Sequence, residues 1–218
     1  SSTVTVGLLN ALHKFAGRDA SPSQLAEEAC LIEIDILGQP IGRQDQYAAA
    51  YGGINAISFD SEGVRVEPIM VSCMSQIRDE FTLVFTGLTR SASEVLGEAP
   101  SNPDNKLTRL RKIRNQADTA EQLLSEGELS KLGILIGEAW YEKRGISAGV
   151  SDDVIDSLHD EIMSLGASGA KLLGAGGGGF FLVHGEKDLR DRLRQLNDKN
   201  RLIPLGVDDI GSTIIFEG

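Results

Sequence analysis

The sequence predicts an α+β fold in which helices pack on one face of a largely antiparallel sheet. Helical and strand-like patterns mix along its 218 residues without a regular β-α repeat, and such a mixture is typical of that class. A turn at Asp60-Ser-Glu-Gly63 joins strand-like runs at 54–59 and 64–68 into a hairpin. The apolar run 81–86 has the composition of a buried strand.

The N-terminal part predicts three helices. Residues 3–15 carry apolar side chains at helical spacing. The second helix has Ser21 as its N-cap with a proline in the first turn, and its pattern extends to Leu37 and stops at Gly38. After a polar loop, an alanine-rich segment at 46–51 is expected to form a short third helix.

The C-terminal part predicts helices and strands around one glycine-rich stretch. This stretch follows directly on a predicted helix and precedes a strand at 179–183. A charged helix and two further strands complete the prediction. The expected helices span 104–125, 128–143, 152–165 and 186–196, and the last strands lie near 201–205 and 213–216.

Composition excludes several classes of protein. Hydrophobic residues make up 41% of the chain and charged residues 24%, which are ordinary globular proportions for one large domain or two small ones. The formal net charge of −11 argues against a nucleic-acid partner, because such a surface needs a positive stripe. No apolar run approaches the length of a membrane span. Cys30 and Cys73 are expected to be reduced thiols, which predicts a cytoplasmic location.

The most informative motif is the glycine-rich run at 171–180. Five of the six residues from Gly174 to Gly179 are glycines. Glycines let backbone amides approach an anion and adopt positive φ. A flexible linker is the alternative, but apolar residues bound the run on both sides. Gly174, Gly176 and Gly179 match G-x-G-x-x-G, yet the dinucleotide fingerprint needs a strand before it and a helix after it, and the opposite order is predicted here.

A second motif is Gly42-Arg-Gln-Asp45-Gln46, in a loop flanked by glycines. Asp45 is placed to project a carboxylate, which could accept a proton from a substrate hydroxyl or stabilise a cation that orients it. The alternative is that Asp45 caps the helix that follows.

Two further features suggest a site for a metal-bound phosphate. Ser1-Ser2-Thr3 opens a helix, where free amides and the dipole favour phosphate and a hydroxyl can ligate Mg²⁺; simple N-capping is the alternative. Glu33 could supply a second Mg²⁺ ligand, and its alternative is a solvated helix face.

These motifs, in this order, resemble those of the GHMP kinases. The chain start looks like a truncated Gly-Leu-Gly-Ser-Ser-type phosphate motif, residues 38–53 like the catalytic-loop region, and 171–180 like the C-terminal glycine motif. The resemblance covers essentially the whole chain. It implies part of the N-terminal S5-like domain at 1–75 and a ferredoxin-like C-terminal domain at 76–218. Runs at 7–12, 42–47 and 83–93 are most similar to bacterial heptose kinases.

The resemblance implies ATP and Mg²⁺ as cofactors and a role for each motif. Asp45 would be the catalytic carboxylate, and Glu33 with Ser1 or Ser2 would hold the metal. The residues implied in binding ATP are Ser1, Ser2, Thr3, Gly174, Gly176, Gly177 and Gly178. The residues implied in binding substrate are Arg43, Arg90, Gly53 and Gly176. Arginine offers a bidentate fork to a sugar phosphate, although structural salt bridges would explain Arg43 and Arg90 equally well.

The expected partner is a small-molecule sugar or sugar phosphate, with no nucleic acid and no membrane, and a homodimer is left open. The family also carries an N-terminal segment with the first sheet and most nucleotide contacts. That segment is absent here, so this chain alone is not expected to turn over ATP. The resemblance to heptose kinases implies phosphorylation of the anomeric hydroxyl of a heptose 7-phosphate. Two alternatives to that function remain: a kinase of the same family for galactose, fucose, mevalonate or homoserine, and a catalytically silent sensor that binds sugar and ATP.

Overall fold

The computed structural model describes residues 2–89, 95, 103–196 and 202–216. The chain forms two compact units, and each is described by itself. Unit 1 comprises Ser1–Met70 and Val207–Gly218, and unit 2 comprises Val71–Gly206. The family-domain boundary at 75/76 stays a prediction. By contacts alone, the chain divides after Met70, and its last residues rejoin the first unit.

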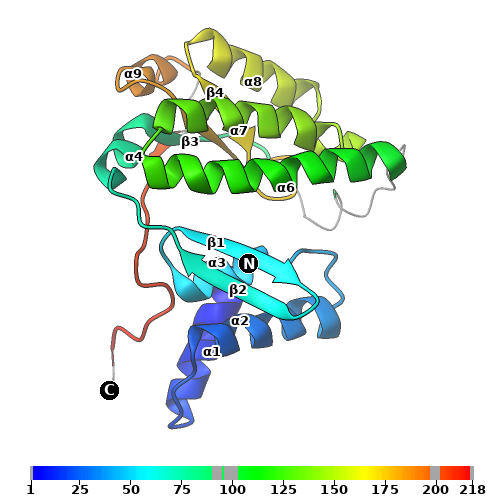
Figure 1. Cartoon of the computed structure of the whole chain (residues 1–218), viewed down its shortest axis with the longest axis vertical. Coiled ribbons are helices and arrows are strands. Elements are labelled where there is room, and N and C mark those ends of the chain that lie inside the picture. The colour runs from blue at the N-terminus through cyan, green and yellow to red at the C-terminus, as the bar shows by residue number, and fades with distance from the viewer. Residues whose placement is uncertain (1, 90–94, 96–102, 197–201, 217–218) are drawn as a thin grey trace. The chain divides into compact units, whose positions relative to one another are not determined.

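Unit 1 packs three helices against a β-hairpin (Figure 1). The helices are α1 (Ser2–Phe15), α2 (Pro22–Cys30) and α3 (Gln44–Tyr51), and the strands β1 (Asn55–Asp60) and β2 (Gly63–Pro68) pair antiparallel as predicted. A π-helix, Leu31–Ile36, continues α2 without a break. The sequence pattern predicts one continuous helix to Leu37, and it gives no signal for the wider π-helical turn.

Small side chains let the helices of unit 1 approach one another. Ala26 and Ala29 of α2 are fully buried, and Val6 of α1 and Tyr47 of α3 pack with them in the same core. The Tyr47 ring also meets Phe59 of β1 edge-on at 5.8 Å, so the hairpin is joined to α3. This core holds the start of α1, the end of α2 and the start of α3 together.

The prediction of a strand at 213–216 is wrong. The segment pairs with no strand among the described residues, and Ile215 and Phe216 are 93% and 82% exposed. The residue just before it is bonded to unit 1 by a side chain, because Asn10 Nδ2 of α1 donates to the Ser212 carbonyl at 3.1 Å. The β-branched residues gave the segment a strand-like composition, but composition cannot supply a partner strand.

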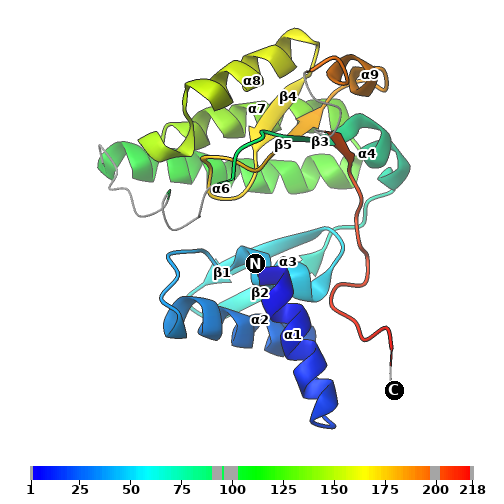
Figure 2. The same ribbon diagram turned by 180° about the vertical axis from the view of Figure 1, so that it is seen from behind.

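Unit 2 contains a four-stranded antiparallel sheet in the order β4-β5-β3-β6, which confirms the predicted α+β class. Its helices α6 and α7 lie side by side in both views (Figures 1 and 2). Its strands are β3 (Phe81–Phe85), β4 (Gly169–Leu172), β5 (Phe180–His184) and β6 (Leu202–Pro204). Its α-helices are α4 (Met74–Glu80), α6 (Pro103–Glu126), α7 (Leu129–Arg144), α8 (Asp153–Ser164) and α9 (Leu189–Leu193).

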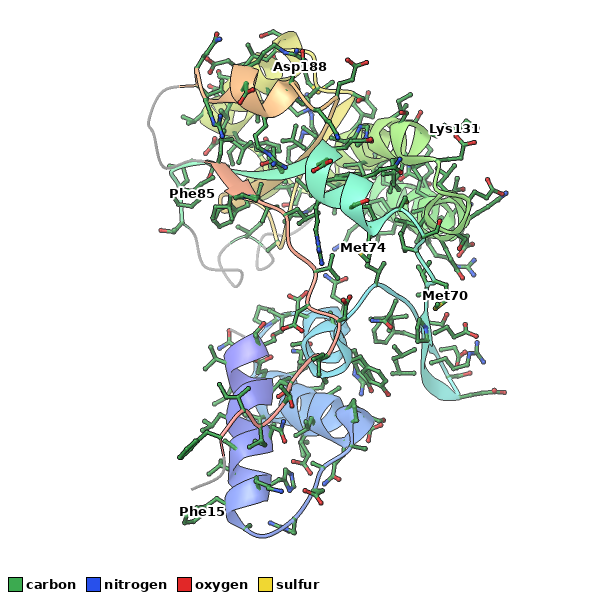
Figure 3. All side chains as sticks on the ribbon, turned by 90° about the vertical axis from the view of Figure 1, so that its left-hand side faces the viewer. Phe15, Met70, Met74, Phe85, Lys131 and Asp188 are labelled. Carbon is green, nitrogen blue, oxygen red and sulfur yellow. The ribbon has the colours of Figure 1, made fainter. Side chains whose placement is uncertain are left out.

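Alternating residues of these strands build the core of unit 2. Val84, Leu172 and Phe181 are fully buried and pack with Trp140 of α7 and Ile155 of α8. On the opposite face, Phe81 and His184 are buried, whereas Phe85 and Phe180 are half-buried. On that face Phe85, at the end of β3 (Figure 3), contacts the ring of Phe180 with centroids 5.0 Å apart.

Three predictions in unit 2 need correction. The helix predicted at 152–165 is confirmed as α8, but strand β4, which lies between it and the glycine run, was missed. Helix α4 was missed, and the helix expected at 186–196 is confined to Leu189–Leu193. β4 is only four residues long and includes glycine and lysine, so it gives little alternation to detect. The dinucleotide motif remains excluded, because strand β5 and not a helix follows the glycines.

Among the described residues, no helix combines the length and the apolar character that a bilayer crossing requires.

Close packing between α7 and β4 depends on glycine and gives a testable prediction. A Cβ at Gly169 would collide with the Gly133 carbonyl and lie 3.0 Å from the Gly137 amide nitrogen. We expect Gly169→Ala to lower the free energy of unfolding by about 1–3 kcal/mol, the usual cost of overpacking. Urea unfolding followed by the fluorescence of Trp140, the single tryptophan of the chain, measures it within unit 2.

Gly206→Ala is the matched control, since a Cβ at Gly206 would meet nothing within 4 Å. It should leave the stability of unit 2 unchanged. Equal effects from the two substitutions would contradict the packing argument.

Candidate active site

The serine at the start of α1 lies in the interior of unit 1. Ser2 is the first residue of the helix and is 4% exposed. Val6, one turn later, is anchored in the core, so this end of the helix is fixed in place. Thr3 is exposed, and Ser1 lies outside the described residues. The roles predicted for Ser1 and Thr3 therefore stay predictions.

The carboxylate of Glu33 is buried next to Ser2. Ser2 Oγ donates to Glu33 Oε2 at 2.8 Å, and Thr5 Oγ1 donates to Glu33 Oε1 at 2.7 Å. Gln46 Nε2 donates a third hydrogen bond to Glu33 Oε2 at 2.6 Å. With only 5% of its surface exposed, Glu33 does not lie on a solvated helix face, and that alternative is excluded.

Two opposing effects determine the ionisation of Glu33. Burial is the larger single effect and favours the neutral acid, whereas the hydrogen bonds from Thr5, Ser2 and Gln46 favour the charged form. The lowering effects together outweigh burial, and the pKa of Glu33 is lowered from its ordinary value. Glu33 is therefore an ionised carboxylate inside the protein at neutral pH.

All of these partners of Glu33 are neutral. Among the described residues, no lysine or arginine side chain forms an ion pair with it. A carboxylate offers about four lone-pair positions, so three hydrogen bonds leave room for a further ligand. A buried charge without a countercharge is costly. The arrangement suits a cation that is bound from outside.

Asp45 lies in the first turn of α3, which begins at Gln44 with Arg43 as the preceding cap residue. Asp45 is thus inside the helix and does not cap it, which excludes the capping alternative. Its side chain is exposed, whereas the next residue, Gln46, is completely buried and bonded to Glu33. Successive residues of α3 therefore present one carboxylate to solvent and one amide to the buried carboxylate.

Two of the predicted substrate residues flank α3. Arg43 is exposed at its start, and Gly53 is exposed just after its end with φ of +70°. Arg43 forms no ion pair among the described residues, so the salt-bridge alternative has no support at that position. Arg90 lies outside the described residues.

In unit 2, the glycine run forms the tight connection between β4 and β5. Gly174, Gly176, Gly177 and Gly178 all have positive φ, between 67° and 158°. This is a conformation that glycine adopts without a steric penalty. The loop is therefore an ordered element of the sheet, and the linker alternative is excluded.

The loop packs closely against its neighbours. Gly177 N donates to the Val150 carbonyl at 3.0 Å, and the Gly179 amide donates to the Leu88 carbonyl at 2.9 Å. A Cβ at Gly176 would lie 2.8 Å from Val150 Cα. A pocket of about 340 Å³ lies along the loop, lined by Thr89, Leu173, Gly174, Ala175, Gly176, Gly178, Gly179 and Phe180.

A partly buried lysine holds the start of this loop. Lys143 Nζ of α7 donates to the Leu172 carbonyl at 2.8 Å and to the Gly174 carbonyl at 2.6 Å. Burial, together with the nearby charge of Lys171, lowers the pKa of Lys143 to about 8. Burial also lowers the pKa of Lys171. Neither lysine has a carboxylate partner among the described residues.

The structure brings the predicted site residues together in two sets. Ser2 and Glu33 are in direct contact in unit 1, and α3 links Asp45 to them through Gln46. The glycines form a single loop in unit 2. Their convergence with the residues of unit 1 on one triphosphate stays a prediction.

Sequence analysis missed Thr5, Gln46 and Lys143. Thr5 is three residues after Ser2 and therefore on the same face of α1, a spacing that could have suggested a shared partner. Gln46 and Lys143 gave no such signal, because their roles depend on contacts 13 and 29 residues away or more.

No group of three or more histidine, cysteine, aspartate or glutamate side chains suited to a metal occurs in the part of the chain that the structure describes. A single carboxylate beside a hydroxyl resembles the sites of Mg²⁺, which is usually held by one or two carboxylates and substrate phosphates.

Comparison with known proteins gives two family matches. The model of the GHMP kinases N terminal domain matches residues 1–53, and that of the GHMP kinases C terminal domain matches residues 120–201. A D-glycero-alpha-D-manno-heptose 7-phosphate kinase of Campylobacter jejuni is 30% identical over 185 residues, which cover 83% of this chain and 55% of the relative. Fucokinase, mevalonate kinase and galactokinase sequences match at 25–29% identity.

Solved structures share the fold. A Campylobacter jejuni structure superposes with a TM-score of 0.74 at 27% identity, covering 97% of this chain and 62% of its own. A heptose 1-phosphate kinase structure from Bacteroides thetaiotaomicron superposes with a TM-score of 0.70 at 24% identity, covering 96% and 60%. The chain thus spans little more than half the length of the first of these relatives.

The conformation of the glycine loop can be tested by two matched substitutions. Gly176→Ala combines a φ of +112° with a collision at Val150, whereas Gly174 has a φ of +67° and open space around it. Gly174→Ala should cost about 1–2 kcal/mol, the penalty of the left-handed region. Gly176→Ala should cost clearly more. Urea unfolding of both variants measures the difference, and equal costs would show that the loop does not contact Val150.

The lowered pKa of Lys143 predicts a pH dependence of stability. Below pH 8 the lysine is protonated in both states and its buried charge is unfavourable. Between about pH 8 and 10.5 the unfolded chain binds more protons than the folded one, so stability rises with pH. We expect wild type to gain stability relative to Lys143→Met over this range.

The measurement is urea unfolding of both proteins across that pH range. Lys131→Met is the control, since Lys131 lies on the exposed side of the same helix (Figure 3). A constant difference between wild type and Lys143→Met at all pH values would contradict the prediction.

Proposed function

The chain belongs to the GHMP kinase family, and from that premise we propose that its protein transfers the γ-phosphoryl group of ATP to a sugar hydroxyl. The observation that carries the proposal is the contact between Ser2 at the start of α1 and the ionised, buried carboxylate of Glu33. It joins a helix N-terminus, which favours phosphate, to an uncompensated negative charge, which favours a metal ion.

The residues present fit Mg²⁺. Glu33 is held ionised by neutral donors and has a lone-pair position left, and Ser2 supplies a hydroxyl beside it. We propose Glu33 and a serine at position 1 or 2 as the metal ligands. When bound, Mg²⁺ neutralises charge on the phosphates during transfer.

Asp45 is the proposed catalytic carboxylate. Phosphoryl transfer depends mainly on positioning and charge stabilisation. An exposed aspartate in the first turn of α3 can accept a hydrogen bond from an acceptor hydroxyl and take its proton as the oxygen attacks. Its backbone is fixed by Gln46 and Tyr47, both buried in unit 1.

The glycine loop is proposed to lie against the phosphates of ATP. Its positive-φ glycines leave the backbone free of side chains, so amides can approach an anion. Lys143 keeps the start of the loop in this shape by binding the Leu172 and Gly174 carbonyls. We propose that ATP is bound by Ser1, Ser2, Thr3, Gly174, Gly176, Gly177 and Gly178. We also propose that the protein acts in the cytoplasm.

The proposed substrate is a heptose 7-phosphate or a similar sugar, phosphorylated at its anomeric hydroxyl for surface-polysaccharide synthesis. The 30% identical relative from Campylobacter jejuni supports this choice. Arg43, Arg90, Gly53 and Gly176 are the proposed substrate contacts. Arg43 has no ionic partner among the described residues and is exposed, as a sugar-phosphate contact requires.

A kinase for another small alcohol is the second candidate. Sequences of fucokinase, mevalonate kinase and galactokinase also match across most of the chain. These matches support the same phosphoryl transfer with a different acceptor. A panel of acceptors, with ADP release as the readout, separates the candidates, and ³¹P NMR of the product identifies the phosphorylated hydroxyl.

Asp45→Asn tests the catalytic assignment. The amide keeps the size of the side chain but cannot take a proton, so we expect kcat to fall by about 10²–10⁴-fold with the preferred acceptor. Asp153→Asn is the control, because Asp153 is likewise an exposed aspartate in the first turn of a helix. It should leave kcat unchanged.

Wild-type kcat retained in Asp45→Asn would refute the role of Asp45. A wild-type protein that releases no ADP with any acceptor, while still binding sugar and ATP, would favour the silent sensor instead.

A further inference from the structure

Gln46 is the side chain of unit 1 whose placement the reaction outlined above does not explain. It is completely buried, and it is adjacent in sequence to the proposed catalytic Asp45. On the premise of the proposed function, we infer that Gln46 is a positioning residue. It holds the Glu33 carboxylate in a fixed position relative to α3, and thereby couples the proposed metal ligand Glu33 to the proposed catalytic residue Asp45.

A hydrogen bond joins the Gln46 side chain directly to the Glu33 carboxylate. Gln46 Nε2 lies 2.6 Å from Glu33 Oε2, the same oxygen that accepts the bond from Ser2 at 2.8 Å. Thr5 is bonded to the other oxygen. Two donors from different helices on one oxygen and one donor on the other restrict both the tilt and the rotation of the carboxylate.

The carbonyl oxygen of the same amide has no hydrogen-bond partner among the described residues. Gln46 Oε1 is buried and accepts no hydrogen bond from the described residues. The reverse orientation would place this oxygen against the Glu33 carboxylate, with two acceptors face to face. The amide is therefore oriented for Glu33, at the expense of its own acceptor. Such buried, unpartnered polar atoms are rare in folded proteins.

The helix that carries Glu33 changes its type just before that residue. It is an α-helix up to Cys30 and a π-helix from Leu31 to Ile36, with Leu37 N donating to the Ile32 carbonyl at 2.9 Å. Single wide turns of this kind occur frequently at functional sites, because they redirect one side chain. Here the redirected turn contains Glu33.

The chemistry explains why the donor is an amide. A lysine or arginine at this position would also hold the carboxylate, but it would neutralise the charge that a metal ion needs. A glutamine fixes the geometry and leaves the negative charge intact. This is the role that hydrogen-bonded neighbours of metal ligands commonly have.

The inference is tested by metal affinity, with Gln46→Met as the main variant. Methionine keeps the approximate volume of the side chain but has no donor for Glu33. Mn²⁺ binding to the intact protein is measured by electron paramagnetic resonance with a non-hydrolysable ATP analogue, and the Mg²⁺ dependence of phosphorylation is measured alongside. We expect Gln46→Met to weaken Mn²⁺ binding by about 10–100-fold and to raise the Mg²⁺ concentration needed for half-maximal rate.

Gln24→Met is the matched control. Gln24 also donates to a glutamate, with Nε2 2.8 Å from Glu28 Oε1, but on the exposed surface of α2. It should bind Mn²⁺ as wild type does. If Gln46→Met does not fold, Gln46→Asn provides the same test, since its shorter amide does not reach Glu33.

The outcomes separate this inference from the proposed function. A wild type that binds Mn²⁺ and phosphorylates a sugar, with a folded Gln46 variant of equal Mn²⁺ affinity, overturns the inference alone. A wild type that binds neither nucleotide nor Mn²⁺ overturns the proposed function and the inference with it. A merely structural role for Gln46 would lower the thermal stability and leave the Mn²⁺ affinity unchanged.

Discussion

The organisation of unit 1 depends on the burial of one charged carboxylate by neutral donors. Desolvation of Glu33 is unfavourable, and the hydrogen bonds from α1 and α3 favour its ionised form. Because those donors come from two helices, their relative placement is part of what maintains the charge. The small buried alanines of α2 make this close approach possible, and the core around Tyr47 fixes it.

Unit 2 shows the opposite charge in a comparable setting. Lys143 is a partly buried amine whose bonded partners are two backbone carbonyls, and no carboxylate pairs with it among the described residues. Its role is to shape the glycine loop that connects two strands of the sheet. Each unit thus contains an ionisable group, buried for Glu33 and partly buried for Lys143, that hydrogen bonds orient and that no opposite side-chain charge among the described residues neutralises. The proposed phosphoryl transfer, which involves a metal cation and phosphate anions, would use both charges.

Membership of the GHMP kinases indicates the type of reaction, phosphoryl transfer, but it does not identify the acceptor molecule. The relatives of this chain are named for a heptose phosphate, fucose, mevalonate and galactose, although they share one fold. Function depends on the site and not on the fold that carries it, so a shared scaffold does not identify the acceptor. Arg43, the proposed substrate contact beside α3, is exposed and takes no part in the hydrogen bonds that hold Glu33.

The sequence by itself determined the α+β class, the hairpin after α3, the capped start of α2 and the identity of the family motifs. These features depend on periodicity, turn residues and caps, which are local properties of the chain. It also identified Ser2, Glu33, Asp45 and the glycines as candidates, because each has a chemical type suited to phosphate or metal.

Only the tertiary structure decided that Glu33 is buried and charged, that Asp45 does not cap its helix, that Gln46 donates to Glu33 and that Lys143 binds the start of the glycine loop. The same holds for strand β4 and for the failure of 213–216 to form a strand. These outcomes depend on partners far apart in the chain, such as Ser2 and Glu33 or Lys143 and Gly174. A local pattern contains no information about such partners until packing brings them into contact.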